Sequence, residues 1–169
     1  LLGILDKTHT AMGSRKMRQW LREPLNSAKE INLRLDAVHE LYSNLLLRNN
    51  IKESLKHIYD FERLAGRIAC GNANGKDLIA LRNSISVLPE IKSELGAASS
   101  ELLRQINDEI DCLSDVYDII DRAICEEPPF TVKDGGLIKE GYSEELDSLK
   151  LSIKDGKNWI SNLENSERE

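Results

Sequence analysis

The sequence predicts an all-α fold: a multi-helix bundle with long, lever-like helices and one small β-hairpin near residues 130–138. Apolar residues recur at spacings of three and four over most of the chain, which is the spacing of one face of a helix. Aromatic residues make up only 5% of the 169 positions, whereas packed β-sheets favour aromatic and β-branched side chains. The core must therefore consist mainly of Leu, Ile and Val, in a chain long enough for one domain.

Capping residues mark the helices of the first part of the chain. Thr10 is predicted to cap a helix that ends near Glu23, because Pro24 disfavours helical geometry in the residue before it. Ser27 and Glu30 form a capping-box pair at the start of a second helix. The periodicity that follows predicts a strongly amphipathic helix. Its apolar face is Ile31, Leu35, Val38, Tyr42 and Leu45.

Turn residues divide the middle of the chain. A break is predicted at Asn49–Asn50, followed by a short apolar turn. Asp60 then caps a helix that stops at Gly71, and Asn74 opens the next one. This next helix is expected to end before Pro89. Its apolar face is Leu78, Leu81, Ile85 and Leu88.

The last third of the chain contains the longest apolar stripes. One stripe, expected to pack against neighbouring helices, is Leu103, Ile106, Ile110, Leu113, Tyr117, Ile120 and Ile124. Two prolines end this segment, and Asp134-Gly135-Gly136 supplies the turn of the expected hairpin between residues 130–132 and 137–138. Ser143 caps a final helix whose seam suits coiled-coil-like pairing. The seam is Leu146, Leu149, Ile153, Gly156, Ile160 and Leu163.

Charge and composition limit the classes of function. The formal net charge of −6 means that the average surface repels nucleic acid, so DNA binding needs a local basic patch or another part of the protein. Neither a signal peptide nor a long apolar span is seen, so we expect a cytoplasmic protein with no membrane partner. The cysteines Cys70, Cys112 and Cys125 are odd in number and far apart, so we expect buried, reduced side chains without disulfides.

Each candidate chemical site has a simpler structural interpretation. Gly71–Asp77 superficially resembles a phosphate-binding loop, but its glycines are one residue too close, Asp77 replaces the required Ser or Thr, and a helix precedes it. We interpret it as a turn. The aspartates Asp108, Asp111, Asp115 and Asp118 have no His nearby and are interpreted as a solvated helix face. We therefore predict no catalytic, cofactor-binding or metal-binding residues, and no enzyme activity, in this chain.

Two groups of basic residues are candidates for contact with DNA. Lys150, Lys154 and Lys157 lie on one side of the final helix and could approach a DNA backbone. Ion pairing with Asp147 and Asp155 on the same helix is the simpler explanation. The first helix is also basic, and there we favour a solvated face. Its apolar side chains, expected to turn inward, are Met17, Trp20 and Leu21.

Several stretches, in order along nearly the whole chain, resemble the bacterial MutS family of DNA mismatch repair proteins. The stretches are Leu1–Leu25, Asp60–Lys92, Glu127–Pro129, Asp134–Ile138, Gly141-Tyr142, Glu145–Asp147, Gly156–Ile160, Leu163-Glu164 and Glu167–Glu169. One of these runs is EPP, then DGGLI, GY and ELD, and all the stretches together are much more specific than any one alone. The chain departs from the family pattern at Ala11, where proline is common, and at Asn74-Gly75-Lys76. Both departures affect helix starts and not chemistry.

The resemblance implies that the chain is part of a core, or lever, domain. Residues 1–142 would form the helical core, and residues 143–169 a truncated helix that leads towards the clamp closing over DNA. The absence of a first Met and of a stop signal after the last helix fits such a piece. The resemblance further implies a DNA-binding protein that recognises mismatches, binds and hydrolyses ATP with Mg²⁺ in domains absent here, and pairs with a second subunit.

Two alternatives remain open from the sequence. A MutS-like homologue that acts in recombination would share these helices. An unrelated helical protein-interaction module would instead be a self-contained monomer whose last helix is covered.

Overall fold

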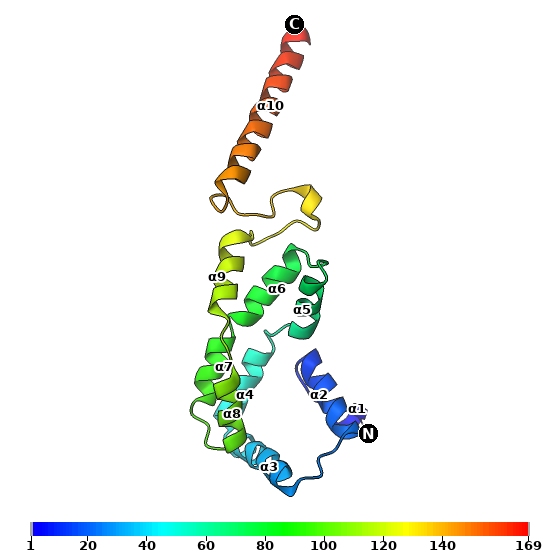
Figure 1. The fold of residues 1–169 in the computed structure, drawn as a ribbon, viewed down its shortest axis with the longest axis vertical. Helices are drawn as coiled ribbons and strands as arrows, with labels where there is room; N and C mark the ends of the chain where they lie inside the picture. The colour runs from blue at the N-terminus through cyan, green and yellow to red at the C-terminus, as the bar shows by residue number, and fades with distance from the viewer. Residues whose placement is uncertain (1, 169) are drawn as a thin grey trace.

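The computed structural model describes residues 2–168, and this part of the chain is built from helices without a β-strand (Figure 1). The elements are α1 Leu2–Leu5, α2 Ala11–Arg22, α3 Ala28–Ser43, α4 Leu45–Leu55, α5 Phe61–Ala69, α6 Gly75–Ile85, α7 Leu88–Leu95, α8 Glu101–Glu109, α9 Ser114–Ala123, the 3₁₀ turn η1 Val132–Asp134, and α10 Glu144–Arg168. The all-α prediction is confirmed. No helix of residues 2–168 combines the length and apolar character needed to cross a membrane.

The body of the molecule contains two separate hydrophobic clusters. The first lies among α3, α4, α7 and α8, with Ala37, Ile91, Leu95, Ala98 and Leu103 buried at its centre. The second joins α6 to α9. Its buried residues are Ile120, Ala123 and Ile124. The two clusters follow one another along the long axis of the molecule, and α10 extends beyond the second (Figure 1).

The predicted helix starts are confirmed by their capping hydrogen bonds. Thr10 Oγ1 accepts from the Gly13 amide at 3.0 Å, and Asp60 Oδ1 accepts from the Arg63 amide at 3.2 Å. Asn74 and Asp77 cap α6 reciprocally, each side chain accepting the other's amide at 2.9 Å. Each contact satisfies an amide that has no partner inside the helix, which is why these residue types mark helix starts so reliably.

The predicted break at Asn49–Asn50 is wrong. The chain leaves helical geometry at Asn44 instead, where the backbone has φ −98° and ψ 87°. The Asn44 side chain accepts from the Leu47 amide at 3.1 Å and so caps α4, which continues through Asn49 and Asn50. A single asparagine that caps the next helix therefore marks the break, whereas two asparagines inside α4 do not interrupt it.

Two other stretches are divided where the sequence indicated continuity. The apolar stripe from Leu103 is interrupted between α8 and α9, because Leu113 has a left-handed backbone at φ 47°. Its amide donates to Asp111 Oδ1 at 2.9 Å. The helix expected to end before Pro89 ends at Ile85, and Pro89 lies in the first turn of α7. Proline is tolerated there because amides of the first turn need no partner within the helix.

The β-hairpin predicted near residues 130–138 is wrong. Thr131 and Asp134 cap a single 3₁₀ turn, and the Thr131 amide donates to Asp134 Oδ2 at 3.1 Å. After the turn, Ile138 pairs with Ile124 at the end of α9, as an isolated antiparallel bridge. The glycine turn does reverse the chain, with φ near 73° at Gly135 and 74° at Gly136. However, the segment after the turn pairs with Ile124 of the body, and within the described residues it forms no strand with residues 130–132.

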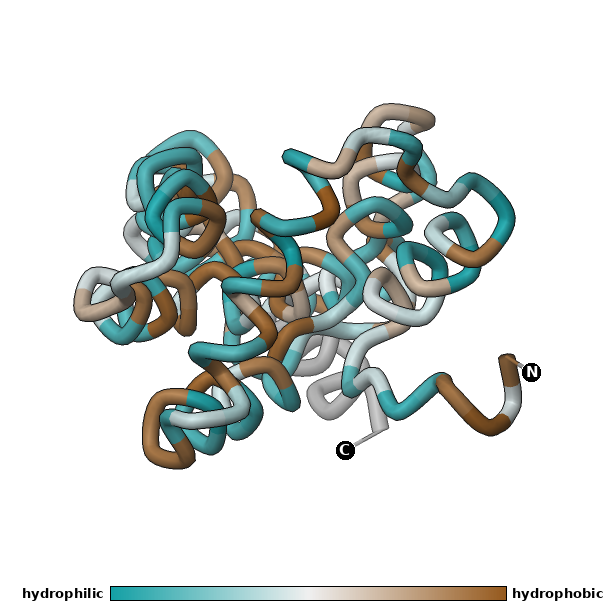
Figure 2. The backbone as a smooth tube through the Cα atoms, turned by 90° about the horizontal axis from the view of Figure 1, so that it is seen from below, coloured by the Kyte–Doolittle hydropathy of each residue, from teal (hydrophilic) through white to brown (hydrophobic). Residues whose placement is uncertain are grey.

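Several apolar side chains of the body are exposed. The apolar face that the sequence places on α3 points to solvent, and Tyr42 is 76% exposed. Ala37 and Leu41, on another side of α3, contribute to the first cluster. The view in Figure 2 shows hydrophobic positions on outer turns of several helices as well as between helices. Amphipathic spacing therefore marks more apolar surface than these helices bury against one another.

Candidate functional site at the base of the last helix

The long helix α10 stands on the segment between α9 and α10 (Figure 1). The hydrogen bonds that tie α10 to earlier residues of the described chain go to positions 138–143. Lys150 Nζ donates to the Ile138 carbonyl at 3.2 Å, and Asp147 Oδ2 accepts from the Gly141 amide at 2.7 Å. Ser143 Oγ accepts from the Leu146 amide at 3.3 Å, as predicted for its cap. The direction of α10 therefore depends on how this segment is fixed to the body.

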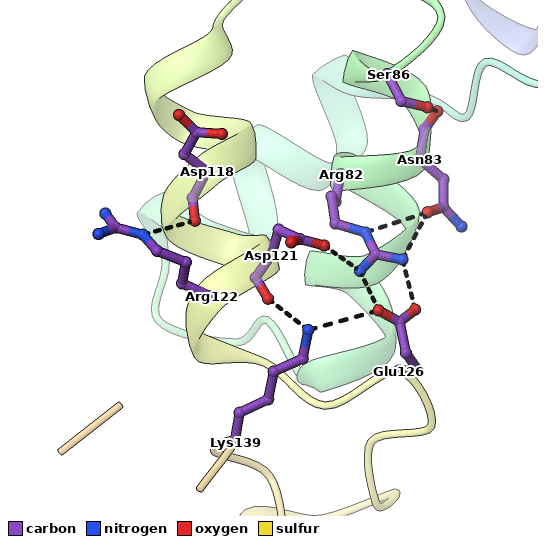
Figure 3. A network of polar contacts seen from close by, with 8 residues as sticks. All are labelled: Arg82, Asn83, Ser86, Asp118, Asp121, Arg122, Glu126 and Lys139. Atoms are coloured by element: carbon purple, nitrogen blue, oxygen red, sulfur yellow. Dashed lines mark hydrogen bonds and ion pairs between the residues drawn. The ribbon is translucent and has the colours of Figure 1, made fainter. Parts of the chain in front are cut away.

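Four residues hold the start of that segment, and we call Arg82, Asp121, Glu126 and Lys139 the Arg82 network (Figure 3). Arg82 lies on α6, and its guanidinium donates to both carboxylate oxygens of Glu126 at 2.7 Å. It also donates to Asp121 Oδ1 on α9 at 2.9 Å. Lys139 Nζ donates to the Asp121 carbonyl at 2.6 Å and lies 3.5 Å from Glu126 Oε1. The network thus joins α6 and α9 to the segment between α9 and α10 at two points, Glu126 near its start and Lys139 after the glycine turn.

The network is buried on one side and open on the other. The Arg82 side chain is 10% exposed, whereas the Glu126 side chain is 62% exposed. Hydrogen bonds from Arg82 are the main reason that the pKa of Glu126 falls to about 2, and the nearby charge of Lys139 lowers this pKa further. The same contacts raise the pKa of Arg82 above its usual value. Glu126 therefore stays ionised even at the pH values where an ordinary glutamate takes up a proton.

The three lysines predicted to contact DNA have different surroundings in the structure. The ammonium of Lys150 is bound to the Ile138 carbonyl and lies 4.0 Å from Asp147, so this residue holds the base of the helix. Lys154 is exposed and, with Lys150, lines an open groove of about 360 Å³ that also contains Glu140. Lys157 is exposed on α10. DNA contact by these lysines stays a prediction.

In the stretch Gly71–Asp77, residues 71–74 form a turn between α5 and α6, as interpreted from the sequence, and the other three begin α6. Gly71 takes φ 68°, which favours glycine. The Asp77 carboxylate occupies the start of α6 by accepting the Asn74 amide, and it lies 2.9 Å from Arg67. A phosphate would meet this carboxylate where a phosphate-binding loop presents free amides, so the residues of this loop do not fit a nucleotide phosphate.

The basic helix near the start of the chain, α2, is fixed by ion pairs that the sequence did not reveal. Arg15 donates to both oxygens of Asp60 at 2.7 and 2.8 Å and also contacts Glu62. The hydrogen bonds from Arg15 lower the pKa of Asp60 to about 2. This contribution to stability is present above the ordinary carboxyl range and is lost as the pH falls through about 2. Arg15 is thus committed to α5 and not free for phosphate.

Two interpretations of side-chain burial are wrong. Trp20 and Leu21 do not turn inward but are partly exposed, and the Arg34 guanidinium lies 3.8 Å from the centre of the Trp20 ring. This stacking gives Trp20 a partner on α3 without burying it. The cysteines are free thiols, as expected, but Cys70 is exposed and Cys112 and Cys125 are half-buried. Within residues 2–168, no group of three or more His, Cys, Asp or Glu side chains is placed to hold a metal ion.

The whole chain, residues 1–169, matches the family model described as MutS domain III. The chain belongs to the MutS family. This finding confirms the resemblance seen in the sequence and removes the unrelated helical module from consideration.

Relatives named DNA mismatch repair protein MutS match the chain over all 169 residues. The proteins of Clostridium perfringens, Alkaliphilus oremlandii and Desulforamulus reducens are each 49% identical to it. The match covers 100% of this chain but only 19%, 19% and 20% of these relatives, respectively. The chain therefore spans about one-fifth of the length of the MutS proteins that it resembles.

In this MutS domain III, sequence reasoning found the helix at the site but not the contacts that hold it. Arg82 and Glu126 are 44 positions apart, and Arg15 and Asp60 are 45 apart. Neither pair shows a periodicity or a motif that would connect its members. The one available signal was the pair Glu126-Glu127 before two prolines, which gave no hint of a partner for either glutamate.

Proposed function

We propose that this segment is a mechanical lever in a protein that binds mismatched DNA and couples that binding to ATP binding and hydrolysis in domains outside the chain. The observation that carries the proposal is the arrangement of α10, which projects from the body and is tied to it through residues 138–143 (Figure 1). A rigid helix held at one end transmits a displacement of that end to its far end. The segment then links two distant sites without carrying either.

The length and surface of α10 support this role. The helix has 25 residues, which at about 1.5 Å per residue corresponds to roughly 37 Å. Leu149, Ile153 and Ile160 of the predicted seam are all exposed in the described part of the chain. Leu163 lies outside the residues whose side chains are described. An apolar seam of this spacing suits a second helix, supplied by another part of the same protein.

The remaining expectations belong to this proposal. We place no catalytic, cofactor or metal site in this segment, and we propose that ATP and Mg²⁺ bind elsewhere in the longer protein. Its partners are the other MutS domains, a second MutS subunit and DNA, in the cytoplasm. The division into a core at residues 1–142 and a helix towards a clamp at 143–169 is part of the same proposal. Action in recombination instead of repair would use the same lever.

The lever role predicts a loss of coupling when the seam is damaged. In the full-length protein, changing both Ile153 and Ile160 to alanine is expected to reduce mismatch-stimulated nucleotide exchange by about fivefold or more, the usual range of a coupling free energy. Exchange without DNA should not change, because the nucleotide site is not altered. Ser152→Ala, on the same helix, is the control. Undiminished stimulation in a folded double variant would contradict the lever role of the seam.

A second candidate function is backbone contact with DNA through the lysines of α10. Its support is that Lys154 and Lys157 are exposed on the projecting helix. We expect weak binding of duplex DNA by this chain, equal for matched and mismatched duplexes. Changing both lysines to glutamine should reduce the slope of log K against log salt by about 2, since each phosphate contact contributes about 0.9. Lys56→Gln, in which the altered residue pairs with Glu53, is the control; an unchanged slope would exclude the contact.

A further inference from the structure

We propose that Arg82 is the positioning residue that sets the direction of α10, by clamping the start of the segment on which α10 stands. The inference about the joint is structural, and its importance for signalling rests on the lever function proposed above. Arg82 does not contact α10 itself. It acts through Glu126 and Asp121, and through the segment that these residues fix.

A continuous series of contacts leads from Arg82 to α10. Arg82 holds Glu126, which lies two residues after Ile124, and Ile124 forms the bridge with Ile138. The bridge is closed by the Cys125 amide, which donates to the Leu137 carbonyl at 3.0 Å, and the Lys139 amide, which donates to the Ala123 carbonyl at 2.9 Å. The Ile138 carbonyl then accepts from Lys150 of α10 at 3.2 Å. A displacement of Glu126 is therefore passed to α10 within a few residues.

The chemistry of arginine suits this position better than that of lysine. One planar guanidinium serves three side chains at once: both oxygens of Glu126, one oxygen of Asp121, and Asn83 Oδ1 at 3.2 Å (Figure 3). A lysine ammonium is a compact charge without the fork that matches a carboxylate. It would keep the attraction to Glu126 but lose the fixed angle between α6 and the segment.

The exposure of the network allows it to open without unfolding the body. Arg82 is buried, but Glu126 and Asp121 lie at the rim of the molecule, where water can replace the guanidinium. The apolar cluster of Ile120, Ala123 and Ile124 also packs against Leu137 and Ile138 of the segment. Breaking the charge pairs thus frees the segment at Glu126, while Leu137 and Ile138 still hold it to the cluster. Such a joint holds α10 in one direction and can let that direction change without unfolding the body.

Hydrogen exchange of the bridge amides tests the joint. In Arg82→Lys, exchange of the Cys125 and Lys139 amides should become about tenfold faster, since losing a charge-assisted hydrogen bond makes local opening easier. The Leu95 amide, in the first cluster, should exchange at its original rate. Arg122→Gln is the matched control, because Arg122 also lies at this site but donates only to the Asp118 carbonyl of its own helix (Figure 3).

The direction of α10 provides a second readout, which a purely structural role would not change. Spin labels at Ser152→Cys on α10 and Ser93→Cys on α7 report the distance between the helix and the body, in a background where the native cysteines are serines. A broader distance distribution in Arg82→Lys supports the proposal. Unchanged exchange together with an unchanged distribution overturns it, and so does faster exchange at Leu95 to the same degree as at Lys139.

Two further measurements keep the conclusions separate. If Arg82→Lys does not fold, Glu126→Gln tests the same joint from its exposed partner, with the same expected and contradicting results. Mismatch-stimulated nucleotide exchange of Arg82→Lys in the full-length protein then tests the lever. A loosened joint with intact stimulation would support the positioning role of Arg82 and contradict the lever function, whereas a joint that is not loosened contradicts the positioning role whatever the stimulation.

Discussion

Ile85→Ala is expected to lower the free energy of unfolding by about 2–5 kcal/mol, the range for removing a large aliphatic side chain from a close-packed interior. Ile85 is the last residue of α6 and is only 1% exposed. The neighbouring Ser84 is also fully buried, and its Oγ accepts from the Tyr59 amide at 2.9 Å and donates to the Ala80 carbonyl at 2.8 Å. This fixed backbone leaves little freedom for the structure to close the cavity.

Urea unfolding followed by circular dichroism measures the effect of Ile85→Ala. Ile119→Ala is the matched control, because Ile119 is the same residue type in the adjacent helix α9 but is 51% exposed. The control should change the free energy of unfolding by less than about 1 kcal/mol. Equal losses in the two variants would show that the end of α6 is not the tightly packed point that the structure describes.

Gly75→Ala is expected to have the second largest effect, a loss of about 1–3 kcal/mol through overpacking. A Cβ atom on Gly75 would lie 2.5 Å from Pro128 Cβ and 2.5 Å from Leu137 Cδ1. The first turn of α6 therefore contacts the segment after α9 so closely that only glycine fits. The substitution should push this segment away from α6, close to Glu126.

Gly66→Ala is the control for Gly75→Ala. Gly66 lies inside α5, and a Cβ there would meet nothing within 4 Å. Alanine should therefore raise stability at this position by about 0.5–1 kcal/mol, because glycine loses more backbone freedom in a helix. Thermal unfolding of the two variants should give shifts of opposite sign. A neutral Gly75→Ala would mean that the contact with Pro128 and Leu137 relaxes freely.

The parts of the fold that the sequence predicted are those determined by neighbouring residues. Thr10, Asp60 and Asn74 cap the helices that they were expected to cap, because a cap needs only an oxygen and an amide three residues later. The errors arose where the residue type alone does not decide the local structure. Asn44 was not distinguished from Asn49–Asn50, and the left-handed Leu113 has no side-chain signature.

The candidate site was predicted less completely, because its contacts join distant parts of the chain. The sequence placed Lys150, Lys154 and Lys157 on one side of α10, but it could not show that Lys150 is used to hold the Ile138 carbonyl. Nor could it show that Arg82 reaches Glu126, since a single charge is compatible with many partners. Periodicity likewise identified the apolar face of α3 without telling that the helices of this chain leave it uncovered.

The two hydrophobic clusters of the body also determine how a force would travel through it. A push along α10 arrives at the cluster between α6 and α9, because the segment after α9 is attached there. Three chain connections lead on to the other cluster: residues 56–60 between α4 and α5, residues 86–87 between α6 and α7, and residues 110–113 between α8 and α9. At the start of the last connection, Lys92 Nζ donates to the Ile110 carbonyl at 2.5 Å. The stiffness of these connections therefore limits how much of a displacement of α10 arrives at the first cluster.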